Sequence, residues 1–394
     1  MSDRLRVFRL VSSAFIVLGA GMAITAVAWP TIADELSLPI ADLGFLTFAY
    51  GAGYTAATLA GGAVTERIPI GRVFAIGSSA AGIGCALAAV SPSWWPLVAA
   101  MPVFGFGAGT FDAAANSYVA VRAGQREMGA IHGLFGVGAI IGPLLVTGSI
   151  AIGLTWRFSF AVVGFGFLAV AVSALLFASG ATIPTRRSTG DTTKLRLSRP
   201  LFWSVFTFLA YAGVAATTGI WAFTYLTESR GLAEGLGGIV VAGYWATFAA
   251  SRFLLSSFGG RFDPARLLRT AMVLTIFAYA VFWASPWLPL TLVALLLAGF
   301  AHGPFFPIEV LETRHRFGPV KAPTVIGFQI AGVNVGGAVI PAGVGILVGI
   351  YDLAVIPPAL VAFAFVTFIG TERLTAVGGP AIPELTDLGS QITD

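Results

Sequence analysis

Long runs of apolar residues follow one another between residues 10 and 370, and most of the breaks between them are short turns or charged pairs. A bilayer core about 30 Å thick is crossed by roughly 20 residues of helix. Counting apolar runs between turn and charge signals predicts twelve spans: 10–33, 41–64, 72–92, 95–121, 128–153, 156–179, 200–226, 236–258, 267–287, 289–311, 324–350 and 353–370. The pattern therefore predicts an all-α integral membrane protein.

Composition excludes several other classes of protein. The 394 residues are 57% hydrophobic and only 10% charged, which is far from the balance of a soluble domain. The alternating ten-residue strands of a β-barrel are not found in the sequence. With one cysteine, Cys85, and three scattered histidines, the sequence offers no disulfide framework, metal site or nucleophile–base pair at helical spacing. We therefore expect neither a metal nor another cofactor, and we do not expect an enzyme.

The positive charges predict an orientation in the membrane. If the N-terminus is cytoplasmic, all but two of the 22 lysines and arginines, Arg157 and Arg230, face the cytoplasm. Both termini should then be cytoplasmic, and the basic face should lie against anionic lipid headgroups. This accounts for the net charge of +4 without nucleic acid. The excess of arginine over lysine, with many Ala and Gly residues, is typical of a bacterial genome of high GC content, so we expect the bacterial cytoplasmic (inner) membrane.

An internal repeat divides the predicted spans into two sets of six. "GFGAGTF" at 105–111 recurs as "GFAHGPF" at 299–305, and "GVGAIIGP" at 136–143 has a looser counterpart in "NVGGAVIP" at 334–341. These pairs fall in corresponding spans of two halves. The predicted division is an N-terminal six-helix bundle at 1–180, a cytoplasmic linker at 181–199, a C-terminal six-helix bundle at 200–373 and a cytoplasmic tail at 374–394. Since one chain holds both halves, we expect a monomer to suffice for function.

Polar side chains inside the spans indicate a binding site or water-filled path, because such groups are costly in lipid. They occur in corresponding spans of the two halves: Asp112, Asn116, His132, His302, Glu309, Gln329 and Asn334. Aromatic residues with hydroxyl or indole groups add to them. The candidate substrate-binding residues are Asn116, Tyr50, Tyr54, Trp221, Tyr225, Gln329, Asn334 and His302. A cavity of this kind suits a small polar organic solute that has apolar ring faces.

Asp112 is the predicted proton-coupling residue, together with His132. It lies about nine residues, or roughly 13 Å, from the cytoplasmic end of its span. Burial disfavours the charged form of a carboxyl group, so we expect Asp112 to take up a proton. The alternative is a structural acid that bonds to a neighbouring helix, and a neutral structural role is likewise open for both buried histidines. Glu309 is expected in a cytoplasmic salt bridge with Arg314 or Arg252.

Two groups of residues carry a resemblance to the major facilitator superfamily. The segment "GGAVTERIPIGR" resembles its signature between spans two and three, and "SRFLLSSFGGRFDPAR" resembles the second copy, in which Gly260 replaces the acid. The resemblance implies a cytoplasmic gate that includes Gly62, Glu66, Arg67, Gly71, Arg72, Arg252 and Arg261. "DAAANSYVA" and "HGLFGVGAIIGP" further resemble the fucose permease-like branch of sugar:proton symporters.

This resemblance implies a sugar as substrate, protons as the coupling ion and alternating access between two halves. Asp112 would take the place of the proton-linked acid, and Asn116 that of an amide that contacts substrate. Ala26 and Ala215 stand where relatives often carry acids. Facilitative uniport, proton-driven efflux of drugs or metabolites, and a receptor without transport are the alternatives.

Overall fold

The computed structural model describes residues 3–122, 125–178, 198–258 and 262–377, and they form helices without a strand in this part of the chain. The helices are α1 (Asp3–Leu36), α2 (Asp42–Arg67), α3 (Ile70–Ala89), α4 (Trp94–Arg122), α5 (Gln125–Ala151), α6 (Trp156–Phe177), α7 (Arg199–Thr224), α8 (Glu234–Phe258), α9 (Pro264–Ala284), α10 (Leu288–His302), α11 (Phe305–Ile350) and α12 (Ile356–Val377). The all-α prediction is confirmed. Most of the predicted linker and tail lies outside the described residues.

Among the residues that the structure describes, eleven helical segments are long and apolar enough to cross a membrane. The second predicted span, α2, is not among them, and its hydropathy is lowered by hydroxyl side chains such as Thr47, Tyr50, Tyr54 and Thr58. The tenth span consists of α10 and the first part of α11, over Leu288–Gly318. The predicted spans 289–311 and 324–350 are joined through α11, in which two helices meet at a kink at Gly318, whose φ of 75° lies in the region that favours glycine.

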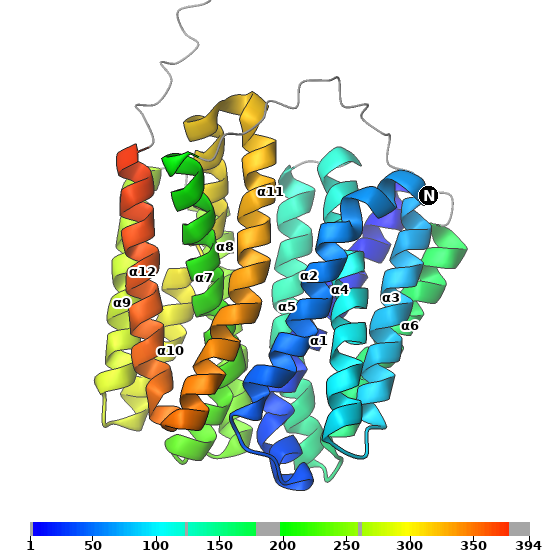
Figure 1. Cartoon of the computed structure of the whole chain (residues 1–394), viewed down its shortest axis with the longest axis vertical. Helices are drawn as coiled ribbons and strands as arrows, with labels where there is room; N and C mark the ends of the chain where they lie inside the picture. Colours follow the sequence, from blue (N-terminus) through cyan, green and yellow to red (C-terminus); the bar gives the residue numbers. More distant parts are fainter. Residues whose placement is uncertain (1–2, 123–124, 179–197, 259–261, 378–394) are drawn as a thin grey trace, which may run out of the picture.

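The helices form two groups that stand side by side. In Figure 1, α1–α6 make up one group and α7–α12 the other, and the beginning of α1 and the end of α12 lie at the same end of the molecule. We call this end the terminal end and the other the opposite end. Contacts between the groups are made chiefly by α2 with α11, α5 with α8 and α1 with α7.

Small residues allow the two groups to approach closely. At the opposite end, a methyl group added to Gly44 of α2 would lie 3.0 Å from the Cα of Gly345 on α11. Along the second contact, the ring of Phe253 on α8 lies over Gly133 of α5. Close approach through small residues is how helices pack in lipid, where no hydrophobic force drives them together. We call the α2–α11 contact the first seam and the α5–α8 contact the second seam.

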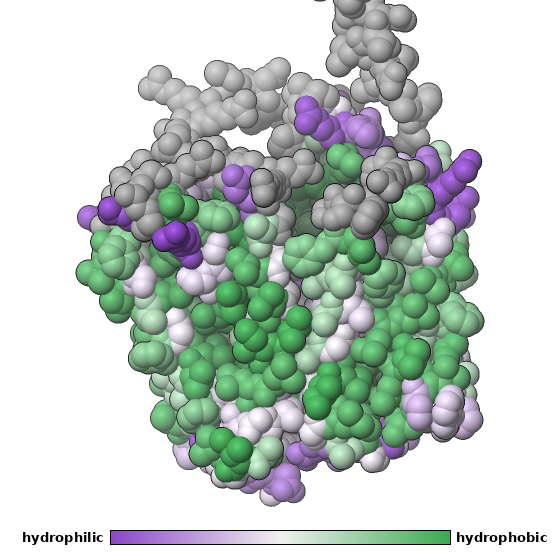
Figure 2. Space-filling model, turned by 180° about the vertical axis from the view of Figure 1, so that it is seen from behind, coloured by the Kyte–Doolittle hydropathy of each residue, from purple (hydrophilic) through white to green (hydrophobic). Residues whose placement is uncertain are grey.

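The surface is that of a membrane protein. Figure 2 shows a broad hydrophobic band around the middle of the molecule, with hydrophilic residues at its two ends.

At the opposite end, Arg157 donates to the carbonyl of Ser91 and Arg230 to that of Ser285. The two serines have the same offset as the repeated segments that begin at Gly105 and Gly299, so the duplication extends to the turns α3–α4 and α9–α10.

Candidate functional site

Asp112 lies on α4 and is bound by side chains from two directions. The Tyr54 hydroxyl on α2 donates to one carboxylate oxygen at 2.6 Å, and the Asn116 amide donates to the other at 2.9 Å. Asn116 reaches Asp112 because residues four apart share a helix face. The carboxylate is half-buried, and the described salt bridges do not include it. It is therefore a membrane carboxylate held by neutral donors.

An aromatic wall adjoins this carboxylate. The ring of Tyr50 lies 6.1 Å from that of Tyr54 and 4.9 Å from that of Phe104, measured between centroids. The Tyr50 hydroxyl is buried and makes no hydrogen bond with any residue the structure describes. A buried hydroxyl without a partner is costly, so this group is free to bond a ligand or a water molecule.

Asn334 connects the two groups of helices. Its amide, on α11, donates to the Thr58 hydroxyl on α2 at 3.1 Å. Nearby, the buried indole of Trp221 on α7 donates to the carbonyl of Pro341 on α11 at 3.1 Å, and its ring packs against Gly345, which meets Gly44 across the first seam. These predicted substrate-binding residues thus lie where the two halves meet.

A second polar cluster surrounds Arg252 of α8. The Arg252 guanidinium donates to the Tyr211 hydroxyl at 3.0 Å and to the Gly303 carbonyl at 3.1 Å. His302 is fully buried and stacks on Tyr211 with 4.4 Å between ring centroids, and its Nε2 donates to the Tyr211 carbonyl at 3.1 Å. Sequence reasoning did not place Tyr211 in the site. The sequence signal for Tyr211 was its place as a tyrosine within a predicted span that also carries other polar residues.

Gln329 takes part in a different network. Its amide donates to Ser204 and Thr313, each at 2.7 Å, within the second group of helices. Glu309, fully buried, pairs with Arg316 at 2.5 Å and not with Arg314 or Arg252 as expected. Gln329 therefore supports the contact of α7 with α11, while Asn334 faces the first seam.

Two other predicted residues make no described contact with Asp112. His132 on α5 meets the ring of Phe15 edge-on at 5.7 Å, and no hydrogen bond joins it to Asp112 among the described contacts. Tyr225, in a short π-helix at Tyr225–Ser229, accepts a hydrogen bond from Arg230 at 3.3 Å. It lies at the opposite end, beyond the last residue of α7.

The predicted gate is only partly visible. Gly71 is buried and Arg72 exposed in the first turn of α3. The side chains of Glu66 and Arg67, the surroundings of Gly62 and the whole of Arg261 lie outside what the structure describes. Of the predicted gate, Arg252 is the member with described bonds, and they lead to α7 and to the turn after α10 rather than to the α8–α9 turn.

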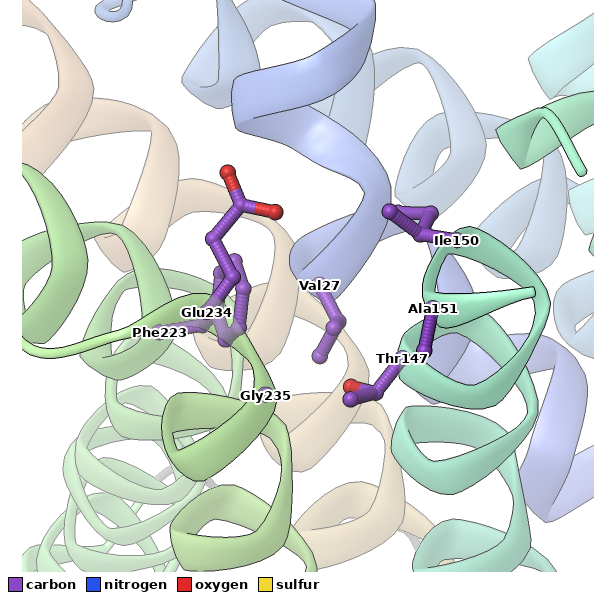
Figure 3. A pocket seen from close by; sticks show the side chains of 7 residues that line it. All are labelled: Val27, Thr147, Ile150, Ala151, Phe223, Glu234 and Gly235. Carbon is purple, nitrogen blue, oxygen red and sulfur yellow. The ribbon is translucent and has the colours of Figure 1, made fainter. Parts of the chain in front are cut away.

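A cavity of about 220 Å³ lies elsewhere, between the two halves at the opposite end. Figure 3 shows its lining, which comes from α1, α5, α7 and α8: Val27, Thr147, Ile150, Ala151, Phe223, Glu234 and Gly235. Since most of these side chains are apolar and none belongs to the Asp112 cluster, we treat this cavity as a vestibule and not as the site itself.

Two halves with polar groups along their contact form the architecture of a secondary transporter. The family model of the Major Facilitator Superfamily matches residues 11–237 and 204–380, so the chain belongs to that superfamily. Its members are transporters and not enzymes. The protein is accordingly a multi-pass membrane transporter.

Relatives of known name agree with this membership. The chain is 24% identical to sodium-dependent glucose transporter 1 of Homo sapiens over 399 residues, covering 88% of this chain and 74% of that protein. Among solved structures, it resembles a bacterial homolog of the human lysosomal transporter Spinster in an inward-facing, unoccupied conformation, with a TM-score of 0.79, 15% identity and coverage of 98% and 100%. It also resembles the transporter FucP in the outward conformation, with a TM-score of 0.66, 16% identity and coverage of 95% and 99%.

Proposed function

We propose that this transporter moves a sugar or a closely related polar solute across the bacterial cytoplasmic membrane by proton-coupled alternating access. In this proposal both termini are cytoplasmic, so the terminal end faces the cytoplasm. The two groups of helices rock about the polar residues between them, and protonation of Asp112 changes which arrangement is stable.

The Asp112 cluster carries the proposal. A carboxylate held by two neutral donors, without a basic partner among the described residues, can lose and regain a proton without breaking an ion pair. Tyr54 belongs to α2, which also forms the first seam, so the charge on Asp112 acts on a helix that contacts the other half. This gives a physical link between proton binding and the contact of the halves.

A sugar is supported by the chemistry of the lining and by the printed names of relatives. Tyr50 offers an aromatic surface for ring faces, and Asn116 and Asn334 carry amides that can bond hydroxyl groups. The human relative is named as a glucose transporter.

Sodium is the alternative coupling ion, because that relative is named as sodium-dependent. The local geometry favours the proton. Sodium would need several oxygen ligands, as other hard cations do. Here a tyrosine hydroxyl and an amide nitrogen both donate toward the carboxylate and occupy its two oxygens.

Uptake into proteoliposomes would test the proposal. A panel of labelled hexoses, pentoses, sugar acids and nucleosides would be offered under an inward proton gradient, an inward sodium gradient or no gradient. We expect a sugar-like solute to accumulate above equilibrium with the proton gradient alone. Accumulation with the sodium gradient alone would show that sodium, and not the proton, is the coupling ion. Equilibration without accumulation would indicate a uniporter. Export of amphipathic dyes without sugar uptake would favour efflux.

A further inference from the structure

The guanidinium of Arg252 has no acidic partner in the described part of the chain. The described salt bridges join Arg157 to Glu35, Arg269 to Glu372, Arg316 to Glu309 and His315 to Glu312. Arg252 is half-buried within the span Glu234–Leu255. An unpaired charge inside a membrane span is expensive and calls for a functional explanation.

The surroundings of Arg252 fix its orientation without using all its donors. Arginine has five N–H donors in a planar fork. One bond goes to the Gly303 carbonyl and one to Tyr211, while the ring of Phe248 lies 4.3 Å and that of Phe306 5.9 Å from the guanidinium carbon. Among the described contacts, three N–H donors therefore have no acceptor. This is the arrangement that binds a carboxylate through two parallel hydrogen bonds.

Tyr211 adds a further donor. Its oxygen accepts from Arg252, so its own hydrogen remains available, and no acceptor for that hydrogen is found in the residues described. The ring is held between His302 at 4.4 Å and Phe305 at 4.3 Å. Tyr211 is thus a buried, fixed hydroxyl beside a fixed guanidinium.

We propose that Arg252 and Tyr211 bind a carboxylate of the transported solute, so that the substrate is a sugar acid such as a hexuronate and not a neutral sugar. The carboxylate end lies against α7, α8 and the turn after α10, in the second half. The hydroxyl groups at the other end are directed toward the first half, whose α5 contacts α8 along the second seam. A solute held in this way bridges the two halves, and its charge supplies the partner that Arg252 lacks.

The inference rests on the proposed function and is tested on the full-length protein in nanodiscs. Binding would be measured for three matched pairs that differ only at C6: glucose and glucuronate, galactose and galacturonate, mannose and mannuronate. In the wild type, we expect at least one uronate to bind about tenfold or more tightly than its neutral partner. A single hydrogen bond between charged groups strengthens binding by at least about this factor.

Variants then assign the effect to Arg252. In Arg252→Gln the preference for the uronate should fall to less than about twofold while the affinity for the neutral sugar is kept, and Arg252→Lys should retain part of the preference. Arg314→Gln, at an exposed arginine of α11, removes the same charge and should leave the preference unchanged. Thermal unfolding without ligand confirms that each variant is folded.

Binding to the wild-type protein separates this inference from the proposed function. Equal binding of uronates and neutral sugars would overturn the inference and leave the proposed function standing. Binding of none of the six would overturn the inference, and the pentoses and nucleosides of the uptake panel would then decide the proposed function. Suppose that a folded Arg252→Gln protein binds neither the neutral sugars nor the uronates. Arg252 would then support the whole site and not the carboxylate alone, and this result would also overturn the inference.

Discussion

The Tyr54 hydroxyl on α2 donates a hydrogen bond of 2.6 Å to the carboxylate of Asp112 on α4. A donor of this kind favours the charged form of the carboxyl group. In Tyr54→Phe the carboxyl should therefore keep its proton to higher pH. A hydrogen bond to a charged group contributes about 1.5–3 kcal/mol, and one pH unit corresponds to about 1.4 kcal/mol. We expect the pH profile of proton-driven uptake to move upward by about one to two units.

Tyr50→Phe is the matched control for that variant. Tyr50 lies one helical turn before Tyr54, and its hydroxyl makes no bond with Asp112 among the described contacts. Its removal should leave the pH profile in place, whatever it does to the affinity for solute. Equal shifts in both variants would show that the Tyr54 bond has no special role.

The hydrogen bond from Asn334 to Thr58 predicts that the first seam must open during transport. Cysteines at these two positions, in a Cys85→Ser background, should be joined by oxidation or by a short thiol cross-linker. We expect the cross-linked protein to lose at least about nine-tenths of its uptake and to recover it on reduction, because alternating access requires relative movement of the halves. The single cysteine variants under the same oxidant are the controls, and unimpaired uptake in the cross-linked protein would mean that this seam stays closed.

Arg316 is expected to be important for stability. It pairs with Glu309, which is fully buried, while Arg316 is only 11% exposed. Removing one partner of a buried pair typically costs about 3–5 kcal/mol, because the other charge is left without compensation. Arg316→Gln should lower the free energy of unfolding in detergent by about that amount, and adding Glu309→Gln should restore most of it.

The exposed pair of Arg269 and Glu372 provides the comparison for that experiment. Its side chains are 61% and 35% exposed, and exposed pairs contribute about 1 kcal/mol or less. Arg269→Gln should thus lower the free energy of unfolding far less than Arg316→Gln does. Similar losses of unfolding free energy in the two variants would show that burial does not decide how much an ion pair contributes to stability.

The sequence allowed the helices to be predicted. Asp112 and Asn116 are four residues apart, a spacing that puts them on one helix face, and the bond of 2.9 Å between their side chains agrees with it. The separation of Gln329 from Asn334 around their helix likewise fits their different partners, Ser204 and Thr58.

Contacts between helices could not be predicted in this way. The bond from Tyr54 to Asp112 depends on the register of α2 against α4, which no spacing within one helix reveals. Arg252 was predicted from its place in the repeated signature, and spacing along the chain could not show that its guanidinium reaches Tyr211 and Gly303. Glu309 was assigned to Arg314 or Arg252 and instead pairs with Arg316, which is two residues beyond Arg314 and so on nearly the opposite face of α11.

Asp112→Asn in proteoliposomes tests the central claim most directly. The solute identified by the uptake panel would be measured in two modes, accumulation under an inward proton gradient and exchange of labelled for unlabelled solute without a gradient. An amide cannot release a proton, so we expect accumulation to be lost while exchange is kept. If the variant still accumulates solute above equilibrium, Asp112 does not carry the coupled proton and the mechanism is wrong.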